Sequence, residues 1–249
     1  MELTPIQEIR GGVFVKRDDL FTIAGACGGK ARACWHLATV QPAAGLITAS
    51  ARKSPQAQIV ARIAAHLGIP ARCHMPGGEA TSEMEDMLAH GAELIQHKAG
   101  YNNVIIARAK ADTAVHPGWV YIPFGMESVA AVGCTAAQVA GLPPGIRRIV
   151  IPIGSGMSAA GVLRGLRRAG LSIPVLGIRV GADPTRRLDA FGGFAWRERL
   201  TIVDVTARWP YHTPVTAAIG GIALDPIYEA KCLDYVERGD LLWVVGHRV

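Results

Sequence analysis

The sequence predicts an α/β protein with mostly parallel β-sheet, and two observations carry this prediction. Short apolar runs of strand length alternate with amphipathic segments of helix length along nearly the whole chain. Strands that alternate with helices in this way form βαβ units, whose strands pair in parallel. The chain has 249 residues, half of them hydrophobic, which is enough to bury a sizeable core as one domain or as two small ones.

Eight apolar runs predict strands, and the segments between them predict helices. The strands are expected at residues 13–15, 45–49, 71–75, 93–95, 119–122, 148–153, 175–178 and 241–245. Helices are expected at residues 54–67, 82–90, 103–114, 127–140 and 158–169. No repeat and no linker-like segment marks a domain boundary.

Composition argues against membrane, secreted and zinc-binding proteins. No apolar run reaches the ~18 residues of a membrane span, and the chain start, Met-Glu-Leu-Thr-Pro, lacks the basic and apolar parts of a secretion signal. The five cysteines form no C-x-x-C pair and no cluster with zinc-ligand spacing. An odd number of unpaired cysteines is typical of buried free thiols in a reducing compartment. We therefore expect a cytoplasmic protein without a metal.

The net charge of +6 allows two interpretations. Part of the excess lies in arginine pairs, at residues 147–148, 167–168 and 186–187. A basic balance can indicate a polyanionic partner, or it can be an ordinary solvated surface. The chain has no long basic run and no basic stripe interleaved with aromatic residues, which favours the solvated surface.

The clearest local motif is a glycine-rich turn, Gly154-Ser155-Gly156-Met157-Ser158, between a predicted strand and a predicted helix. Glycines let the backbone approach a ligand closely, and the free amides and dipole at a helix start stabilise an anion. No Walker A lysine follows, and Ala159 stands at the third glycine of G-x-G-x-x-G. The motif thus favours a small phosphate ligand over NAD, with an ordinary βα turn as the alternative.

Two segments near the N-terminus resemble a known enzyme family. Lys16-Arg17-Asp18-Asp19 is followed by Gly28-Gly29-Lys30-Ala31-Arg32. The pair is similar to fold-type-II enzymes that use pyridoxal 5'-phosphate (PLP), the tryptophan synthase β-like class. It is most similar to the branch of 1-aminocyclopropane-1-carboxylate deaminase and D-cysteine desulfhydrase. In that branch the lysine of Gly-Gly-Asn-Lys-x-Arg forms a Schiff base with PLP, so the resemblance implies this role for Lys30. The family asparagine before the lysine is absent here.

A second segment, Ser54-Pro55-Gln56, resembles the family's Ser-Asn-Gln/His. The resemblance implies that Ser54 lies over the cofactor near the substrate and that Gln56 helps to bind the cofactor. Pro55 replaces the asparagine that contacts the ring hydroxyl, and proline offers neither that side-chain contact nor a backbone N–H. The orientation of the ring, and with it the reaction, is therefore left open.

A third segment, residues 225–231 with the sequence Asp-Pro-Ile-Tyr-Glu-Ala-Lys, resembles the deaminase Asp-Pro-Val-Tyr-Glu-Gly-Lys. The resemblance implies that Glu229 pairs with the pyridine nitrogen and that Tyr228 contacts the cofactor. A carboxylate beside the nitrogen keeps it protonated, which makes the ring a strong electron sink. Tyr211 takes the place of an active-site tyrosine of the deaminases. These landmarks follow one another in the family's order.

The resemblance implies two three-layer α/β domains with mostly parallel sheets, PLP as cofactor, and a homodimer. The larger, PLP-binding domain is expected at residues 1–42 and 117–249, and a smaller inserted domain at 43–116. The implied activity is a lyase step, deamination or elimination, on an amino-acid-like substrate. The resemblance also implies that Lys30 acts as base and that Ser54 and Tyr211 act on the substrate. The chain is shorter than we expect for this family, which leaves the site more open.

Two alternatives remain. Arg52 and Lys53 stand before Ser54, where the family has small or neutral residues; they could bind a carboxylate or phosphate, or form a basic loop in solvent. With the net charge they suggest a substrate whose amino acid is attached to a nucleic acid, as in DNA modification. The other alternative is a non-catalytic PLP-binding protein, with Pro55 as a mark of lost catalysis. The histidines, including those at positions 36, 66, 74 and 212, show no evident partner in the sequence.

Overall fold

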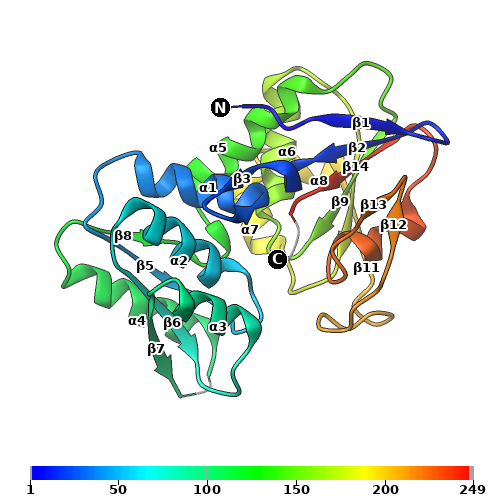
Figure 1. Ribbon diagram of the computed structural model, residues 1–249. Helices are drawn as coiled ribbons and strands as arrows, with labels where there is room; N and C mark the ends of the chain where they lie inside the picture. The colour runs from blue at the N-terminus through cyan, green and yellow to red at the C-terminus, as the bar shows by residue number, and fades with distance from the viewer. Residues whose placement is uncertain (1, 99, 247–249) are drawn as a thin grey trace. The chain divides into compact units, whose positions relative to one another are not determined.

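The computed structural model describes residues 2–98 and 100–246, which fold into two compact units. The first unit combines Met1–Phe21 with Ala131–Val249, and the second unit, Thr22–Ala130, is inserted between these two parts of the chain. Each unit is built on its own sheet with helices packed against it (Figure 1). The mixed α/β class with mostly parallel sheets is therefore confirmed.

The sheet of the first unit has six strands. Their order is β1 (Ile6–Ile9), β2 (Val13–Arg17), β14 (Asp240–Val244), β9 (Arg148–Ile153), β10 (Val175–Arg179) and β11 (Leu200–Asp204). Every neighbouring pair is parallel except β1 and β2. Strands β9 and β14 lie inside the sheet and are almost fully buried, which explains their nearly continuous apolar sequence.

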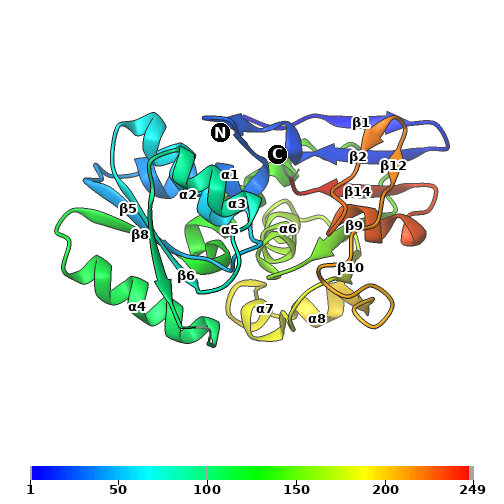
Figure 2. The same cartoon turned by 60° about the horizontal axis from the view of Figure 1, so that its bottom comes forward.

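Helices cover one face of this sheet, and shorter elements cover the other. The first face holds α5 (Val129–Ala137), the short helix η3 (Gln138–Gly141), α6 (Met157–Arg168), α7 (Thr185–Phe191) and α8 (Trp196–Arg199). Helices α6 to α8 lie together beside β9 and β10 in Figure 2. The opposite face packs against the short helix η4 (Glu229–Tyr235) and the hairpin of β12 (Ala218–Ile219) and β13 (Ile222–Ala223).

The second unit has a parallel sheet of four strands. Their order is β7 (Glu93–His97), β6 (Ala71–Pro76), β5 (Gly45–Ala49) and β8 (Trp119–Ile122). On one face α4 (Asn102–Ala114) packs Ile105 and Ala109 against Ile47 and Ala49. The remaining elements are α1 (Gly28–Thr39), α2 (Gln56–Leu67), α3 (Ser82–Ala89), the short helices η1 (Asp18–Leu20, in the first unit) and η2 (Phe124–Met126), and the hairpin of β3 (Thr22–Ile23) and β4 (Ala26–Cys27).

The inserted unit is wider than the insertion expected at residues 43–116. Strand β8 follows that range and completes the sheet by pairing with β5. Helix α1 precedes it and packs against α2 and β8. Contacts therefore assign both elements to the inserted unit, while the assignment of cofactor binding to the larger domain stays a prediction. All eight predicted strands are present, and β5, β8 and β9 have the predicted bounds.

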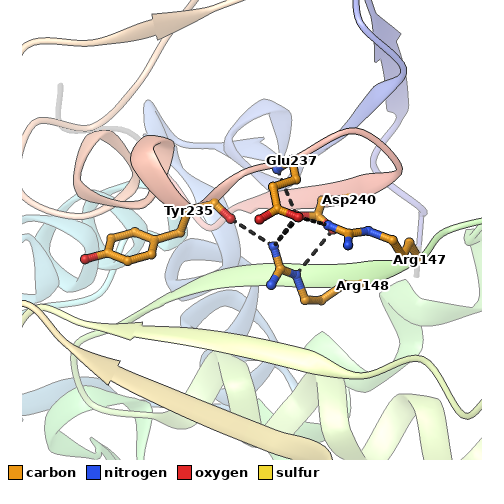
Figure 3. A network of polar contacts seen from close by, with 5 residues as sticks. All are labelled: Arg147, Arg148, Tyr235, Glu237 and Asp240. Carbon is orange, nitrogen blue, oxygen red and sulfur yellow. Dashed lines mark hydrogen bonds and ion pairs between the residues drawn. The ribbon is translucent and has the colours of Figure 1, made fainter.

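A polar network ties the amino end of β9 to that of β14 (Figure 3). Asp240 is fully buried, and its carboxylate accepts hydrogen bonds from Arg148 at 2.6 and 3.3 Å and from Arg147 at 3.1 Å. The backbone N–H of Glu237 donates to the same carboxylate at 2.9 Å, and Arg148 also donates to the carbonyl of Tyr235 at 3.0 Å. These bonds compensate the buried charge and fix the two strands against each other.

Two further findings bear on composition. Among residues 2–98 and 100–246, no helix combines the length and the apolar character that crossing a bilayer requires. The five cysteines form no disulfide with one another; Cys34, Cys73, Cys134 and Cys232 are buried, as predicted, while Cys27 is only half-buried.

Candidate functional site

The predicted phosphate loop joins β9 to α6 in the first unit and leaves no room for side chains at its glycines. Gly156 has a φ of +87°, and a Cβ on it would lie 2.9 Å from Cβ of Pro184. A Cβ on Gly154 would lie 2.8 Å from Cε1 of Tyr228. The first amides of α6 have no carbonyl partner within the helix, and its first turn contains no acidic residue. The loop therefore has the backbone and the charge to hold a phosphate.

Two tyrosines predicted for the site meet beside this loop. The hydroxyl groups of Tyr211 and Tyr228 are hydrogen-bonded at 2.6 Å, and their rings stand edge to face. The buried amine of Lys231 donates to the carbonyls of Pro210 and Tyr211 at 3.1 and 3.2 Å. Lys231 thus holds the backbone that carries Tyr211. Its role could not be predicted because its partners lie about twenty residues earlier in the chain.

Glu229 is fully buried and only half satisfied. Its Oε1 accepts a hydrogen bond from the backbone N–H of Val245 at 2.7 Å, while its buried Oε2 has no partner among the residues that the structure describes. Burial raises the pKa of the Glu229 carboxyl well above its usual range, and the charge of Asp225 raises it further. A buried carboxylate oxygen without a partner is costly, so it fits a cationic or hydrogen-bond-donating group. A protonated pyridine nitrogen is such a group.

Lys30 lies in the inserted unit, in the first turn of α1, and its side chain is half-buried. The first turn of this helix contains no acidic residue. The loop between β5 and α2 carries Ser54, whose hydroxyl accepts a hydrogen bond from the N–H of Gln56 at 3.3 Å. Ser54 follows the carboxyl end of the parallel strand β5, the end at which open α/β sheets bind their ligands. Lys30 follows β4 of the antiparallel β3–β4 hairpin.

Gln56 is buried, and its amide is engaged by protein groups. The amide nitrogen donates to the hydroxyl of Thr48 at 2.8 Å and to the carbonyl of Pro123 at 2.9 Å. The amide oxygen accepts from the N–H of Gly125 at 2.7 Å. Gln56 therefore links the carboxyl ends of β5 and β8, and its predicted contact with the cofactor stays a prediction.

Arg52 and Lys53 differ in their surroundings. The guanidinium of Arg52 lies against Gly78 and donates to the carbonyl of Glu79 at 3.1 Å, while its carbonyl accepts from Thr81 at 2.9 Å. Arg52 is thus anchored on the loop between β6 and α3. Lys53 is exposed, so it is the more accessible of the two cations to a substrate.

The Lys16–Asp19 segment, which carries part of the resemblance, serves the fold of the first unit. Lys16 and Asp18 are buried. Lys16 donates to the carbonyl of Thr4 at 2.5 Å, and Asp18 accepts from the hydroxyl of Thr4 at 2.7 Å and from the indole of Trp243 at 3.1 Å. The segment therefore joins the N-terminal strands to β14.

His74, for which the sequence shows no evident partner, has two partners in the structure. One ring nitrogen of His74 is 2.9 Å from the carboxylate of Asp112, and the other is 2.9 Å from Nε2 of His97. Burial, followed by the charge of His74, lowers the pKa of His97. The three residues come from β6, β7 and α4, so their spacing in the sequence gave no signal.

A protein family and several known proteins match this chain. Residues 2–240 match the family described as "Pyridoxal-phosphate dependent enzyme". A biosynthetic L-threonine dehydratase of Pasteurella multocida is 31% identical over 192 residues, which cover 71% of this chain and 36% of that protein. An L-threonine ammonia-lyase of Geobacter sulfurreducens is 29% identical over 161 residues, covering 63% and 39%. The chain thus spans little more than a third of the length of these relatives.

Solved structures share the fold. A homologue of 1-aminocyclopropane-1-carboxylate (ACC) deaminase superposes with a TM-score of 0.79 at 23% identity, covering 99% of this chain and 90% of the other. Maize serine racemase gives a TM-score of 0.65 at 19% identity, covering 99% and 88%. The family match covers nearly the whole chain and agrees with the fold-type-II architecture. This chain therefore belongs to the family of pyridoxal-phosphate dependent enzymes.

Proposed function

We propose that this chain is a PLP-dependent lyase that deaminates an amino-acid-like substrate or eliminates a group from it. The observation that carries the proposal is the buried Oε2 of Glu229, which has no hydrogen-bond partner among residues 2–98 and 100–246. Glu229 follows Tyr228, and the Tyr228 ring lies against Gly154 of the phosphate loop. One unit thus offers an acceptor for a ring nitrogen and an anion-binding loop for a phosphate, the two ends of PLP.

The residues present fit the cofactor in number and chemistry. The amides and hydroxyls of residues 154–158 would hold the phosphate, Glu229 would hold the ring nitrogen, and Lys30 would attach the cofactor through its ε-amine. When bound, PLP withdraws electrons from the α-carbon of an amino substrate. A cationic partner at Oε2 would lower the raised pKa of Glu229 and keep the carboxylate ionised.

Different side chains of the protein would remove a proton from the substrate and donate one to it. The Lys30 amine, once released from the cofactor, would take a proton from a substrate carbon. In the Tyr211–Tyr228 pair one hydroxyl donates to the other, so the donor's partner keeps a proton to give to the substrate. Ser54 would help to orient the substrate. The relatives named threonine dehydratase and ammonia-lyase support lyase chemistry.

The first experiment is an absorbance spectrum of the protein with PLP, before and after borohydride. Wild type and the control Lys110→Ala, an exposed lysine on α4, should show a band that borohydride fixes covalently. Lys30→Ala should lack it. A band of equal strength in Lys30→Ala would refute the role of Lys30, and no band in wild type would refute PLP binding.

Substrate identity is tested by ammonia and 2-oxo-acid release from L-threonine, D-cysteine and 1-aminocyclopropane-1-carboxylate. An oligonucleotide that carries an amino acid tests the nucleic-acid-linked alternative, which the exposed Lys53 beside Ser54 supports. Release of bound PLP by amino acids, without any product, would instead support the non-catalytic alternative.

We also propose a cytoplasmic homodimer. The buried free thiols suit a reducing compartment, and the family resemblance implies a dimer. Light scattering after gel filtration would show about twice the 26.4 kDa chain mass; a single-chain mass would contradict the dimer.

A further inference from the structure

The positive charge of the protein is concentrated in one part of the first unit. Between Met157 and Arg199 the chain carries eight arginines, no lysine and three acidic residues. This segment therefore contributes five of the six net charges. The sequence alone favoured an ordinary solvated surface, but the fold brings part of this charge to one face of α6.

Three arginines, Arg164, Arg167 and Arg168, share this face because residues three and four apart are neighbours on a helix. None of them has an ion-pair partner among the residues that the structure describes. They lie toward the end of α6 that is remote from the phosphate loop, since twelve helical residues span about 18 Å. The arginine face of α6 is thus separate from the proposed cofactor site.

Phe194 stands beside this face and is 91% exposed. It lies between Gly193 and Ala195, which have φ angles of +88° and +59°. The left-handed conformation is costly for alanine, and the exposed ring gains no packing energy in return. A Cβ on Gly193 would lie 3.8 Å from the guanidinium of Arg167, so this loop adjoins the end of α6. Trp196, buried and hydrogen-bonded to Asp189 at 3.0 Å, anchors the loop from the other side.

We propose that Phe194 and the arginine face of α6 bind a single-stranded nucleic acid. Guanidinium groups bind phosphates through paired hydrogen bonds, and an exposed aromatic ring stacks on an unpaired base. Arginines at the C-terminal end of α6 are also stabilised by the helix dipole. The dipole does not explain why Phe194 is exposed. The proposal is independent of PLP binding.

Other polyanions fit the surface less well. A membrane surface takes up several apolar side chains from one face, but Phe194 is the only exposed large apolar residue in the described segment 157–199. Duplex DNA keeps its bases stacked on one another, and an acidic peptide has no bases to stack on the ring. These polyanions serve as comparison ligands in the test.

The test is fluorescence anisotropy of a labelled 15-nucleotide deoxythymidine strand with the full-length protein, over a range of salt concentrations. Three phosphate contacts predict a slope of log affinity against log salt of about −2. Arg167→Gln with Arg168→Gln should reduce the steepness by about 1.4. The control, Arg10→Gln with Arg238→Gln, removes the same charge from exposed positions on the turns beside β2 and β14 and should leave the slope unchanged.

Phe194→Ala separates base stacking from charge. It should weaken binding of the single strand by about 5- to 150-fold and leave binding of polyglutamate of equal charge unchanged. Circular dichroism should show an unchanged fold for every variant. Equal affinity of wild type and Phe194→Ala for the single strand would overturn the proposal. So would preference for polyglutamate, duplex DNA or phosphatidylserine vesicles over the single strand.

Discussion

Replacing Gly154 by alanine tests the site where the phosphate loop meets Tyr228. The added Cβ would lie 2.8 Å from Cε1 and 3.4 Å from the hydroxyl of Tyr228, whereas ordinary carbon contacts begin near ~3.5 Å. The Tyr228 ring must therefore move by roughly 0.7 Å, away from the position in which its hydroxyl is 2.6 Å from that of Tyr211. Such overpacking costs about 1–3 kcal/mol.

This energetic cost should weaken PLP binding, because the added methyl group displaces both the loop backbone and Tyr228. We expect Gly154→Ala to weaken PLP binding by about 5- to 150-fold, the range that ~1–3 kcal/mol gives, with the far-ultraviolet circular dichroism unchanged. The assay is a PLP titration followed by absorbance. The matched control is Gly133→Ala in α5, where a Cβ meets nothing within 4 Å. Unchanged PLP affinity in Gly154→Ala would refute the packing of Tyr228 on the loop.

Three further predictions concern the same unit. Because the pKa of Glu229 is raised in the folded protein, the free energy of unfolding without PLP should fall as pH rises above the ordinary carboxyl range. Glu229→Gln should remove this decrease in stability with pH, which thermal unfolding from pH 4 to 8 measures. The same pH dependence in the variant would show that protonated Glu229 is not its cause. Asp240→Asn removes the buried carboxylate that Arg147 and Arg148 share. The loss of its charged hydrogen bonds should cost about 1.5–3 kcal/mol, or roughly 3–12 °C in Tm. The control is Asp234→Asn, which breaks an exposed ion pair and should cost about 1 kcal/mol or less. Equal losses of stability in the two variants would refute the stabilising role of the Asp240 network. Tyr211→Phe should lower kcat by about 10²- to 10⁴-fold if its hydroxyl moves a proton; a normal kcat would assign it a packing role only.

The sequence predicted the buried strands well because their pattern is local. Strands β5 and β9 are covered on both faces and appear as unbroken apolar runs. Strand β1, with the sequence Ile-Gln-Glu-Ile, is an edge strand with little apolar content, and it was missed. So was β11, at the other edge. Partial burial at an edge weakens the signal on which the prediction rests. It does not remove that signal, because β7 and β8, the edges of the other sheet, were predicted.

Features formed by distant residues could not be predicted. The strand–turn–helix unit around residues 154–158 could be predicted because its parts are contiguous in the sequence. The Glu229 oxygen that has no partner in the described part of the chain could not be predicted, since its state depends on what surrounds η4. The His74–Asp112 contact joins residues 38 positions apart, and the pairing of β8 with β5 spans more than seventy. Pair contacts of this kind follow from the fold and leave no spacing rule in the sequence.

The polar network around Asp240 limits which parts of this fold can vary during evolution. Strands β9 and β14 are neighbours about 4.8 Å apart, held together at their amino ends. At their carboxyl ends, β9 leads into Gly154, and β14 into Val245, whose N–H holds Glu229. The pairing of β9 with β14 therefore fixes the distance between Gly154 and Val245. Under the proposed function, substitutions in the inserted unit would alter substrate preference, while the distance between Gly154 and Val245 would stay as the sheet sets it.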